Sequence, residues 1–441
     1  MGYLICLIIV IAVIISVSYK LSRGNMLSPT LIVSVMFFMS CALMLLLYRR
    51  WDVDFLPKTG IVIVVALVCM LLGEQGAALL PCRHQPAASG SSGSDRIHIG
   101  TVTLIVFFVF SLLTLCLYNL ETRKMVAASE LVTTVEGQSL SFLRLVREVQ
   151  VREGGTVAYY VQHMYTFLMA LAYVLLYIVI HNLVFHREVI RSVLPVLVIL
   201  SFLITSSMSG GRTDILNYFC YAIVIFVISF YQKNGASHAV NKRLILIVLV
   251  LGCGAVLLFF LAGVLTGKTF DYDSVTDNFA NYFSSSVYAL NEYVRNPERF
   301  APETDFFGIH CFFGIYTVLR KLGLHIPEPI VALEFIRCGK YETNIYTALR
   351  RYLQDFGMVG LSLIMAGLGA LYKGLLRSIR FARYSDLMII LVSMICYPLF
   401  FVSIEERFFL SVITTRTVHQ AIYVILIWLW VFKGRLRKKE Q

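Results

Sequence analysis

Repeated long apolar runs constrain the fold of this chain more than any other feature. Early examples lie at residues 3–18, 27–47, 61–72 and 102–117, and similar runs continue almost to the end of the chain. A helix of about 20 apolar residues spans the ~30 Å hydrocarbon core of a bilayer. The sequence therefore predicts an all-α fold, a polytopic transmembrane helical bundle.

The apolar runs predict eleven spans, and the composition agrees with them. Only 15% of the residues are charged, whereas a soluble domain carries roughly 25%. We expect eight spans in residues 1–265, a large loop over 266–355, three spans in 356–432 and a basic tail over 433–441. The predicted spans centre near Val10, Met36, Val65, Phe108, Leu171, Val198, Ile225, Val250, Leu363, Leu391 and Ile425.

The basic residues predict how the spans are oriented. Five lysines and arginines in residues 433–439 place the C-terminus in the cytoplasm by the positive-inside rule. The loop with Lys373, Arg377, Arg380 and Arg383 is then cytoplasmic as well, and so are Lys233, Lys242 and Arg243. Counting spans makes 266–355 extracytoplasmic, with an expected re-entrant or interfacial helix at Phe306–Leu319. Arg49, Arg50 and the basic stretch 119–160 would face outward too, so the N-terminal orientation stays open.

Charge and cysteines exclude two classes of function. The net charge of +12 comes mostly from short loops and the tail, which is membrane topology rather than a nucleic-acid surface. The ten cysteines form no CxxC and no metal-ligand spacing, so we expect no metal. Cys311 and Cys338 lie outside the apolar runs and would be able to pair in an oxidising compartment.

Two arginines stand near predicted spans. The last span is expected to begin near Phe408, which would put Arg416 roughly 12 Å along the helix, on the same face as His419. A charge at that depth needs a reason: it either binds substrate phosphate or locks the bundle through a carboxylate such as Glu74. Arg212 follows a small-residue turn at a helix start, which suits phosphate, although an ordinary polar turn is an equal alternative.

A third cluster of polar residues precedes the ninth span. If residues 341–360 are helical, one stripe carries Asn344, Thr347, Arg351 and Asp355, with Tyr346 and Arg350 beside it. Aromatic rings, amides and arginines together suit a sugar-phosphate ligand, and the alternative is a solvated helix before the membrane.

Short acidic patterns are weaker signals. Two DxD pairs, Asp52/Asp54 and Asp271/Asp273, are of the kind that can hold a divalent metal in glycosyl transfer. Two-residue patterns of this kind arise easily by chance. Glu405 lies in a short turn with Glu406 and Arg407, where a carboxylate would be placed to act as a general base.

The run TNIYTALRRYLQDFGMVG (Thr343–Gly360) resembles the signature of Wzy-type oligosaccharide repeat-unit polymerases. Asn281–Gly323 and the turn Ser209–Thr213 are similar to that family as well. The resemblance covers Ser206–Gly360, whereas the first 200 residues match only as a hydropathy pattern.

The resemblance implies a GT-C-like fold in the bacterial cytoplasmic (inner) membrane, with the active site at its outer face. Such polymerases transfer a glycan chain from undecaprenyl pyrophosphate to a new repeat unit on the same lipid, and build O-antigen of lipopolysaccharide, capsule or exopolysaccharide. The expected partners are lipid-linked oligosaccharide, membrane lipid, a chain-length regulator and a flippase. No cofactor, metal, nucleotide sugar or nucleic acid is expected.

The resemblance and the polar clusters together nominate the site residues. Arg212, Arg350, Arg351 and Arg416 are the predicted phosphate ligands, and Asn344, Tyr346, Thr347 and His419 complete the predicted substrate site. The candidates for the general base are Glu342, His310, Asp355 and Glu405.

Three other functions stay open from the sequence. They are an O-antigen ligase-like glycosyltransferase, a lipid-linked oligosaccharide flippase or transporter, and a structural assembly partner. A transporter is disfavoured because the sequence shows no repeat-related halves or interrupted helices.

Overall fold

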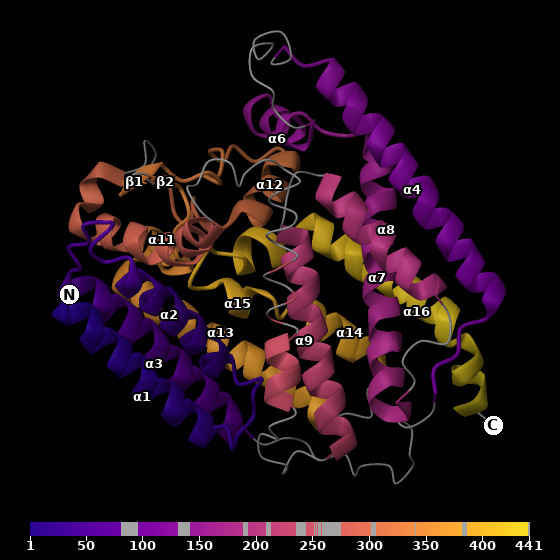
Figure 1. Ribbon diagram of the computed structural model, residues 1–441, viewed down its shortest axis with the longest axis horizontal. Helices are drawn as coiled ribbons and strands as arrows, with labels where there is room; N and C mark the ends of the chain where they lie inside the picture. The colour runs from indigo at the N-terminus through magenta and orange to yellow at the C-terminus, as the bar shows by residue number, and fades with distance from the viewer. Residues whose placement is uncertain are drawn as a thin grey trace. The chain divides into compact units, whose positions relative to one another are not determined.

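A computed structural model of the protein describes most of the chain as helix, with one two-stranded sheet (Figure 1). Helices dominate because lipid offers no partners to backbone N–H and C=O groups, which a helix satisfies internally. The predicted all-α membrane class is confirmed in the part of the chain that the structure describes. The described residues are 1–80, 96–130, 142–187, 193–208, 213–234, 244–250, 252, 254, 257, 275–300, 306–339, 341–381 and 386–439.

Eight of the described helices are long and apolar enough to cross a membrane. Two shorter apolar segments are α8 (Leu194–Met208) and α14 (Asp386–Met394) with α15 (Pro398–Phe401). Every predicted span centre lies in one of these helices except Val250, whose span falls largely outside the described residues. The eight are α1 (Gly2–Leu21), α2 (Pro29–Leu46), α3 (Pro57–Leu79), α4 (Thr101–Ala127), α7 (Tyr159–His186), α9 (Thr213–Asn234), α13 (Ala348–Phe381) and α16 (Thr415–Lys439).

The chain forms two compact units, and neither is continuous in sequence. The first unit comprises Met1–Ala87, Thr276–Arg383 and Ile395–Thr417. The second comprises Ala88–Val275, Tyr384–Met394 and Val418–Gln441. The divisions expected at residues 265, 355 and 432 follow chain order, whereas the units join the first three helices to residues near the end.

In the first unit, α1, α2 and α3 lie side by side, and α13 packs along α3 (Figure 1). Two glycines allow the approach of α3 and α13. A Cβ added to Gly73 would lie 1.9 Å from the carbonyl oxygen of Ala366, and one on Gly369 would lie 2.2 Å from that of Met70. Helices in lipid associate largely by van der Waals packing, so small residues at the contact set how closely the backbones meet.

A buried carboxylate joins three of these helices. Glu74 is fully buried in α3 and accepts hydrogen bonds from Ser28 Oγ at 2.8 Å and the backbone N–H of Thr30 at 3.1 Å. It thereby caps the start of α2. Its third partner is Lys373 Nζ of α13, at 3.1 Å, so the suggested pairing of Glu74 with Arg416 is wrong.

Basic residues expected in a cytoplasmic loop lie instead in α13. Lys373 and Arg377 both fall within this helix. Arg377 donates to the carbonyl oxygens of Ala77, Ala78 and Leu80 at 2.9–3.2 Å. It thus satisfies carbonyls that the end of α3 leaves without helical partners.

Between α3 and α13, the first unit contains one long helix and several short elements. They are α11 (Val275–Arg295), η2 (Pro297–Phe300), α12 (Phe313–Lys321), and strands β1 (Ile336–Cys338) and β2 (Tyr341–Thr343), which pair antiparallel. Helix α12 covers part of the segment expected to form an interfacial helix. It buries Gly314 and Tyr316 and exposes Ile315 and Val318.

Helix α11 is tied to the connection between α2 and α3. Asn291 accepts from the backbone N–H of Leu56 at 2.8 Å and donates to the carbonyl oxygen of Asp54 at 2.9 Å. Arg295 bonds the Asp54 carboxylate at 2.9 Å. This carboxylate of the first DxD pair therefore serves an ion pair, whereas Asp271 and Asp273 lie outside the described residues.

Cys311 and Cys338, which would be able to pair in an oxidising compartment, are both buried and free. The disulfide is thus not formed in the structure. Their surroundings differ. Burial, and secondly the charge of Asp355, raises the pKa of Cys311, whereas burial, and secondly the charge of Glu292, raises the pKa of Cys338.

The second unit packs around α7. Tyr218 and Tyr221 of α9 donate to the carbonyl oxygens of Ala172 and Tyr173 at 3.0 and 2.8 Å. Tyr177 of α7 donates to Asp386 at the start of α14, at 2.6 Å. This unit also contains α4, α8, most of α16 and the amphipathic helix α6 (Phe142–Arg152), which the sequence analysis did not expect.

Gly73→Ala should destabilise the protein, and Gly76→Ala on the same helix should not. A new Cβ at Gly73 meets a backbone oxygen, and overpacking typically costs about 1–3 kcal/mol. A Cβ at Gly76 meets nothing within 4 Å, and alanine is the better helix former by about 1 kcal/mol. The apparent Tm of the two variants in detergent tests this, and equal values would refute the close contact.

Candidate functional site

The break in α13 creates the local geometry of the site. Gly357 has φ 64° and ψ −170°, a conformation open essentially only to glycine. The break separates a first part, residues 348–356, from the long remainder of the helix. Asn344 and Thr347, expected on the helical stripe, precede the helix, whereas Arg351 and Asp355 share a face within its first part.

A buried histidine–aspartate pair lies on that face. His310 Nδ1 is 2.6 Å from Asp355 Oδ1, and each side chain is 2% exposed. The backbone N–H of His310 also donates to Asp355 Oδ2 at 3.1 Å. The carboxylate thus orients the imidazole through Nδ1 and leaves Nε2 as the ring nitrogen not bonded to it. Hydrolases use the same arrangement to hold a histidine base.

Arg351 fixes the loop that carries His310. Its guanidinium is buried and donates to the carbonyl oxygens of His310 at 2.7 Å, Ile330 at 2.8 Å and Val331 at 2.5 Å. The sequence predicted a phosphate ligand here, but the structure directs these donors to backbone carbonyls. Arg351 therefore positions the histidine–aspartate pair.

A second buried carboxylate organises the neighbouring turn. Glu406 is 1% exposed and accepts hydrogen bonds from the backbone N–H groups of Phe408, Phe409 and Leu410 at 2.8–2.9 Å and from Tyr352 at 2.9 Å. It caps the π-helical turn η3 (Phe408–Val412). Burial raises the pKa of Glu406, although these hydrogen bonds oppose the shift.

The residues on either side of Glu406 form an ion pair. Glu405, a predicted general base, bonds Arg407, and their side chains are 35% and 20% exposed. Burial opposes the charge of Arg407, but Glu405, Tyr282 and Tyr397 together favour it, and the pKa of Arg407 is raised. Phe312 and Phe409 pack with ring centroids 5.2 Å apart, which joins this turn to the His310 loop.

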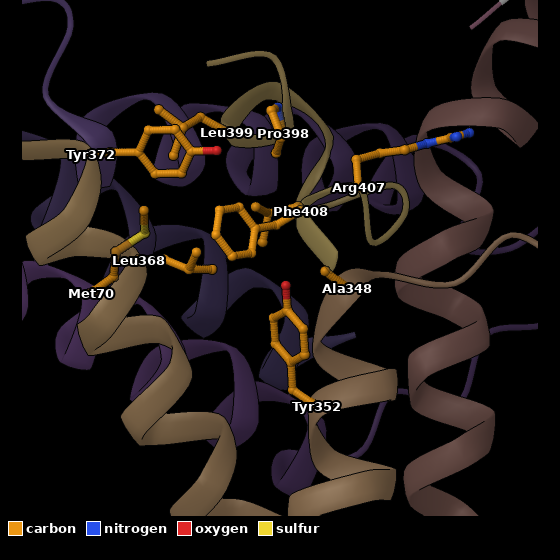
Figure 2. Close-up of a pocket in the computed structure, with 10 residues that line it drawn as sticks. Met70, Ala348, Tyr352, Leu368, Tyr372, Pro398, Leu399, Arg407 and Phe408 are labelled. Atoms are coloured by element: carbon orange, nitrogen blue, oxygen red, sulfur yellow. The ribbon is translucent and has the colours of Figure 1, made fainter. Parts of the chain in front are cut away.

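A small cavity lies between this turn and α13 (Figure 2). Its space of about 10 Å³ admits about one water molecule. Figure 2 shows the hydroxyl of Tyr352 directed into it and the guanidinium of Arg407 extending away from it. The cavity is too small for a sugar and is mainly a packing gap.

Arg350 occupies a different environment from Arg351. It is fully buried, with Cζ 3.9 Å from the ring centroid of Tyr346, 5.0 Å from that of Phe300 and 5.2 Å from that of Tyr293. We call these three rings the aromatic cage. Nη2 of Arg350 lies 2.5 Å from Glu334 Oε2. Burial raises the pKa of Tyr346 to about 12, so its hydroxyl stays a donor, here to the carbonyl oxygen of Glu334 at 3.2 Å.

Other predicted site residues lie elsewhere. Glu342 is exposed on β2, opposite Arg337. Arg416 is the second residue of α16 and is exposed, because residues 408–412 form a separate turn and α16 begins only at Thr415. The predicted depth of about 12 Å for Arg416 is therefore wrong. Arg212 lies outside the described residues.

His419 belongs to a cluster in the second unit. Its ring centroid is 4.9 Å from that of His163, whose Nδ1 is 2.7 Å from the hydroxyl of Tyr423. No local motif marks His163 in the sequence, because its partners are distant in the chain.

The described residues hold no group of three or more His, Cys, Asp or Glu side chains placed for a metal ion. What the first unit does provide is an oriented imidazole, a positioning arginine and an ion pair in the adjacent turn. An imidazole held in this way has one ring nitrogen that Asp355 does not bond.

Comparison with known proteins found no match: no family model, no curated protein and no solved structure resembles the chain closely enough.

Glu406→Ala should lower the apparent Tm by at least about 5 °C, and Glu405→Ala should barely change it. Removing Glu406 leaves buried donors unpaired at roughly 1–3 kcal/mol each, and each kcal/mol shifts Tm by about 2–4 °C in a unit of this size. The partly exposed Glu405 pair contributes about 0–1 kcal/mol. Thermal unfolding of both variants in detergent checks the contrast, and a reversed order would show that Glu406 does not cap the turn.

Proposed function

We propose that the chain is a membrane glycosyltransferase that polymerises lipid-linked oligosaccharide repeat units. It transfers the glycan chain from undecaprenyl pyrophosphate to a new lipid-linked repeat unit at the outer face of the bacterial cytoplasmic membrane. The observation that carries the proposal is the buried pair of His310 and Asp355. Asp355 lies in the stretch Thr343–Gly360 that resembles the polymerase signature, and His310 lies in the similar segment before it.

In the proposed reaction, an acceptor hydroxyl attacks the anomeric carbon of the donor glycan. The new C–O bond forms as the bond to pyrophosphate breaks, and the pyrophosphate leaves with the electron pair. His310 Nε2 takes the hydroxyl proton, and Asp355 stabilises the resulting imidazolium. General base catalysis of this kind typically contributes 10²–10⁴-fold.

The leaving group needs cationic partners. Arg416, exposed at the start of α16, stays proposed as a phosphate ligand, whereas Arg212 lies outside the described residues. Arg351 leaves this set because its donors already bond backbone carbonyls. Arg407 joins it, since its turn packs against the His310 loop.

The surface glycan of a deletion strain separates the proposed polymerase from the neighbouring functions. Loss of a polymerase leaves single capped repeat units, loss of a ligase leaves unattached polymer, and loss of a flippase leaves almost no glycan outside. Either of the last two patterns would refute the proposal.

His310→Ala should reduce elongation of purified lipid-linked repeat units by at least about 10²-fold, since it removes the proposed base. His325→Ala is the matched control, because His325 is exposed in the same stretch of the first unit. The rate of ladder formation is measured in nanodiscs at equal amounts of folded protein. A wild-type rate in His310→Ala would exclude the pair as the base.

A cysteine at Asn296 should be labelled by an impermeant thiol reagent in intact spheroplasts. A cysteine appended after Gln441 should be labelled only after permeabilisation. Asn296 is exposed, and the positive-inside rule puts the basic C-terminal tail in the cytoplasm. Both variants are made in a cysteine-free background, and the opposite labelling pattern would invert the proposed topology.

A further inference from the structure

Arg350 has unused hydrogen-bonding capacity in a buried place. It is 0% exposed, and among the described residues its side chain makes one hydrogen bond, from Nη2 to Glu334. Nε and Nη1 have no hydrogen-bond partner among the described residues. Buried donors in native proteins are rarely left unpaired, and each exception calls for a physical reason.

The surroundings of Arg350 add an acceptor and apolar surface. Gln354 lies one turn further on the same face of α13 and donates from Nε2 to the carbonyl oxygen of Phe300 at 2.6 Å. Its Oε1 is buried and has no partner among the described residues. Because the ring of Phe300 also lies 5.0 Å from Arg350, the unmet donors, the unmet acceptor and the aromatic cage belong to one region.

Glu334 is poorly matched to its partner in burial. Its side chain is 46% exposed, whereas that of Arg350 is fully buried. A half-exposed carboxylate is able to turn back into water, which is not possible for the arginine. Nη2, the nitrogen that Glu334 occupies, belongs to both two-nitrogen forks of the guanidinium, one with Nε and one with Nη1. Each fork fits a planar carboxylate.

We infer that Glu334 holds the place of a ligand carboxylate and that the region around Arg350 binds an acidic sugar. The resident partner is itself a carboxylate, so the geometry for one already exists. In the complex, the sugar carboxylate takes a guanidinium fork, the sugar ring contacts the aromatic cage, and a sugar hydroxyl donates to Gln354 Oε1. The inference rests on the proposed function for the ligand being a saccharide, and it makes an acidic sugar part of the repeat unit.

Titration of purified full-length protein with sodium glucuronate, glucose and inorganic phosphate tests the inference, with thermal stabilisation as the readout. Glucuronate should stabilise the protein, and glucose should not. Glu334→Ala removes the competing carboxylate and should lower the Kd for glucuronate about tenfold, a gain of about 1.4 kcal/mol. Glu328→Ala, at an exposed glutamate before β1, should leave it unchanged. Arg350→Lys keeps the charge but lacks the fork, and should lose binding.

Three results would overturn the inference. Equal stabilisation by glucose would mean that no carboxylate is recognised. Stronger stabilisation by phosphate than by glucuronate would show that the ligand is a phosphate and not an acidic sugar. No response to glucuronate in folded Glu334→Ala would mean that the unpaired nitrogens hold only water. The assay requires no elongation, so a protein that binds glucuronate but never extends a glycan would refute the polymerase and keep this site.

Discussion

The close contact between α3 and α13 is the constraint on which the first unit depends. Gly73 and Gly369 let the two backbones meet, and the buried Glu74 then reaches Lys373 of α13 and the start of α2. In lipid, helices gain little from hydrophobic burial, so a close backbone fit and a satisfied polar group must hold them together. The candidate site lies at the N-terminal end of α13, before the break at Gly357. The contact between α3 and α13 therefore also holds the helix that carries the site residues.

The break at Gly357 divides α13 into a part that packs in the bundle and a part that carries polar chemistry. Five polar residues of the short first part are buried or half-buried, and three of them leave no buried polar atom without a partner among the described residues. Arg351 bonds three carbonyls, Asp355 bonds His310, and Tyr352 bonds Glu406. Arg350 and Gln354 differ, because two nitrogens of Arg350 and Oε1 of Gln354 have no partner among the described residues. A fully paired group stabilises the fold, whereas an unpaired one in the same helix is the better indication of a ligand.

Sequence patterns predicted part of the candidate site and missed the rest for identifiable reasons. Helical spacing placed Arg351 and Asp355 on one face, and both do contact His310. The same spacing extended the helix too far back to Asn344 and put Arg416 inside a span, because a continuous apolar run hid the turn at residues 408–412. Glu334 carried no local signal, since its partner Arg350 lies in another element.

The sequence alone determined the membrane class of the protein and the positions of nearly all its described spans, because hydropathy and helix length are local properties that the bilayer selects directly. Only the tertiary structure decided which charges meet. Glu74 and Lys373 are 299 residues apart, and His310 and Asp355 are 45 residues apart. No periodicity along the chain records such pairs. They form because burial in a low-dielectric interior requires each polar group to find a partner, and the packing of distant helices determines which partner is within reach.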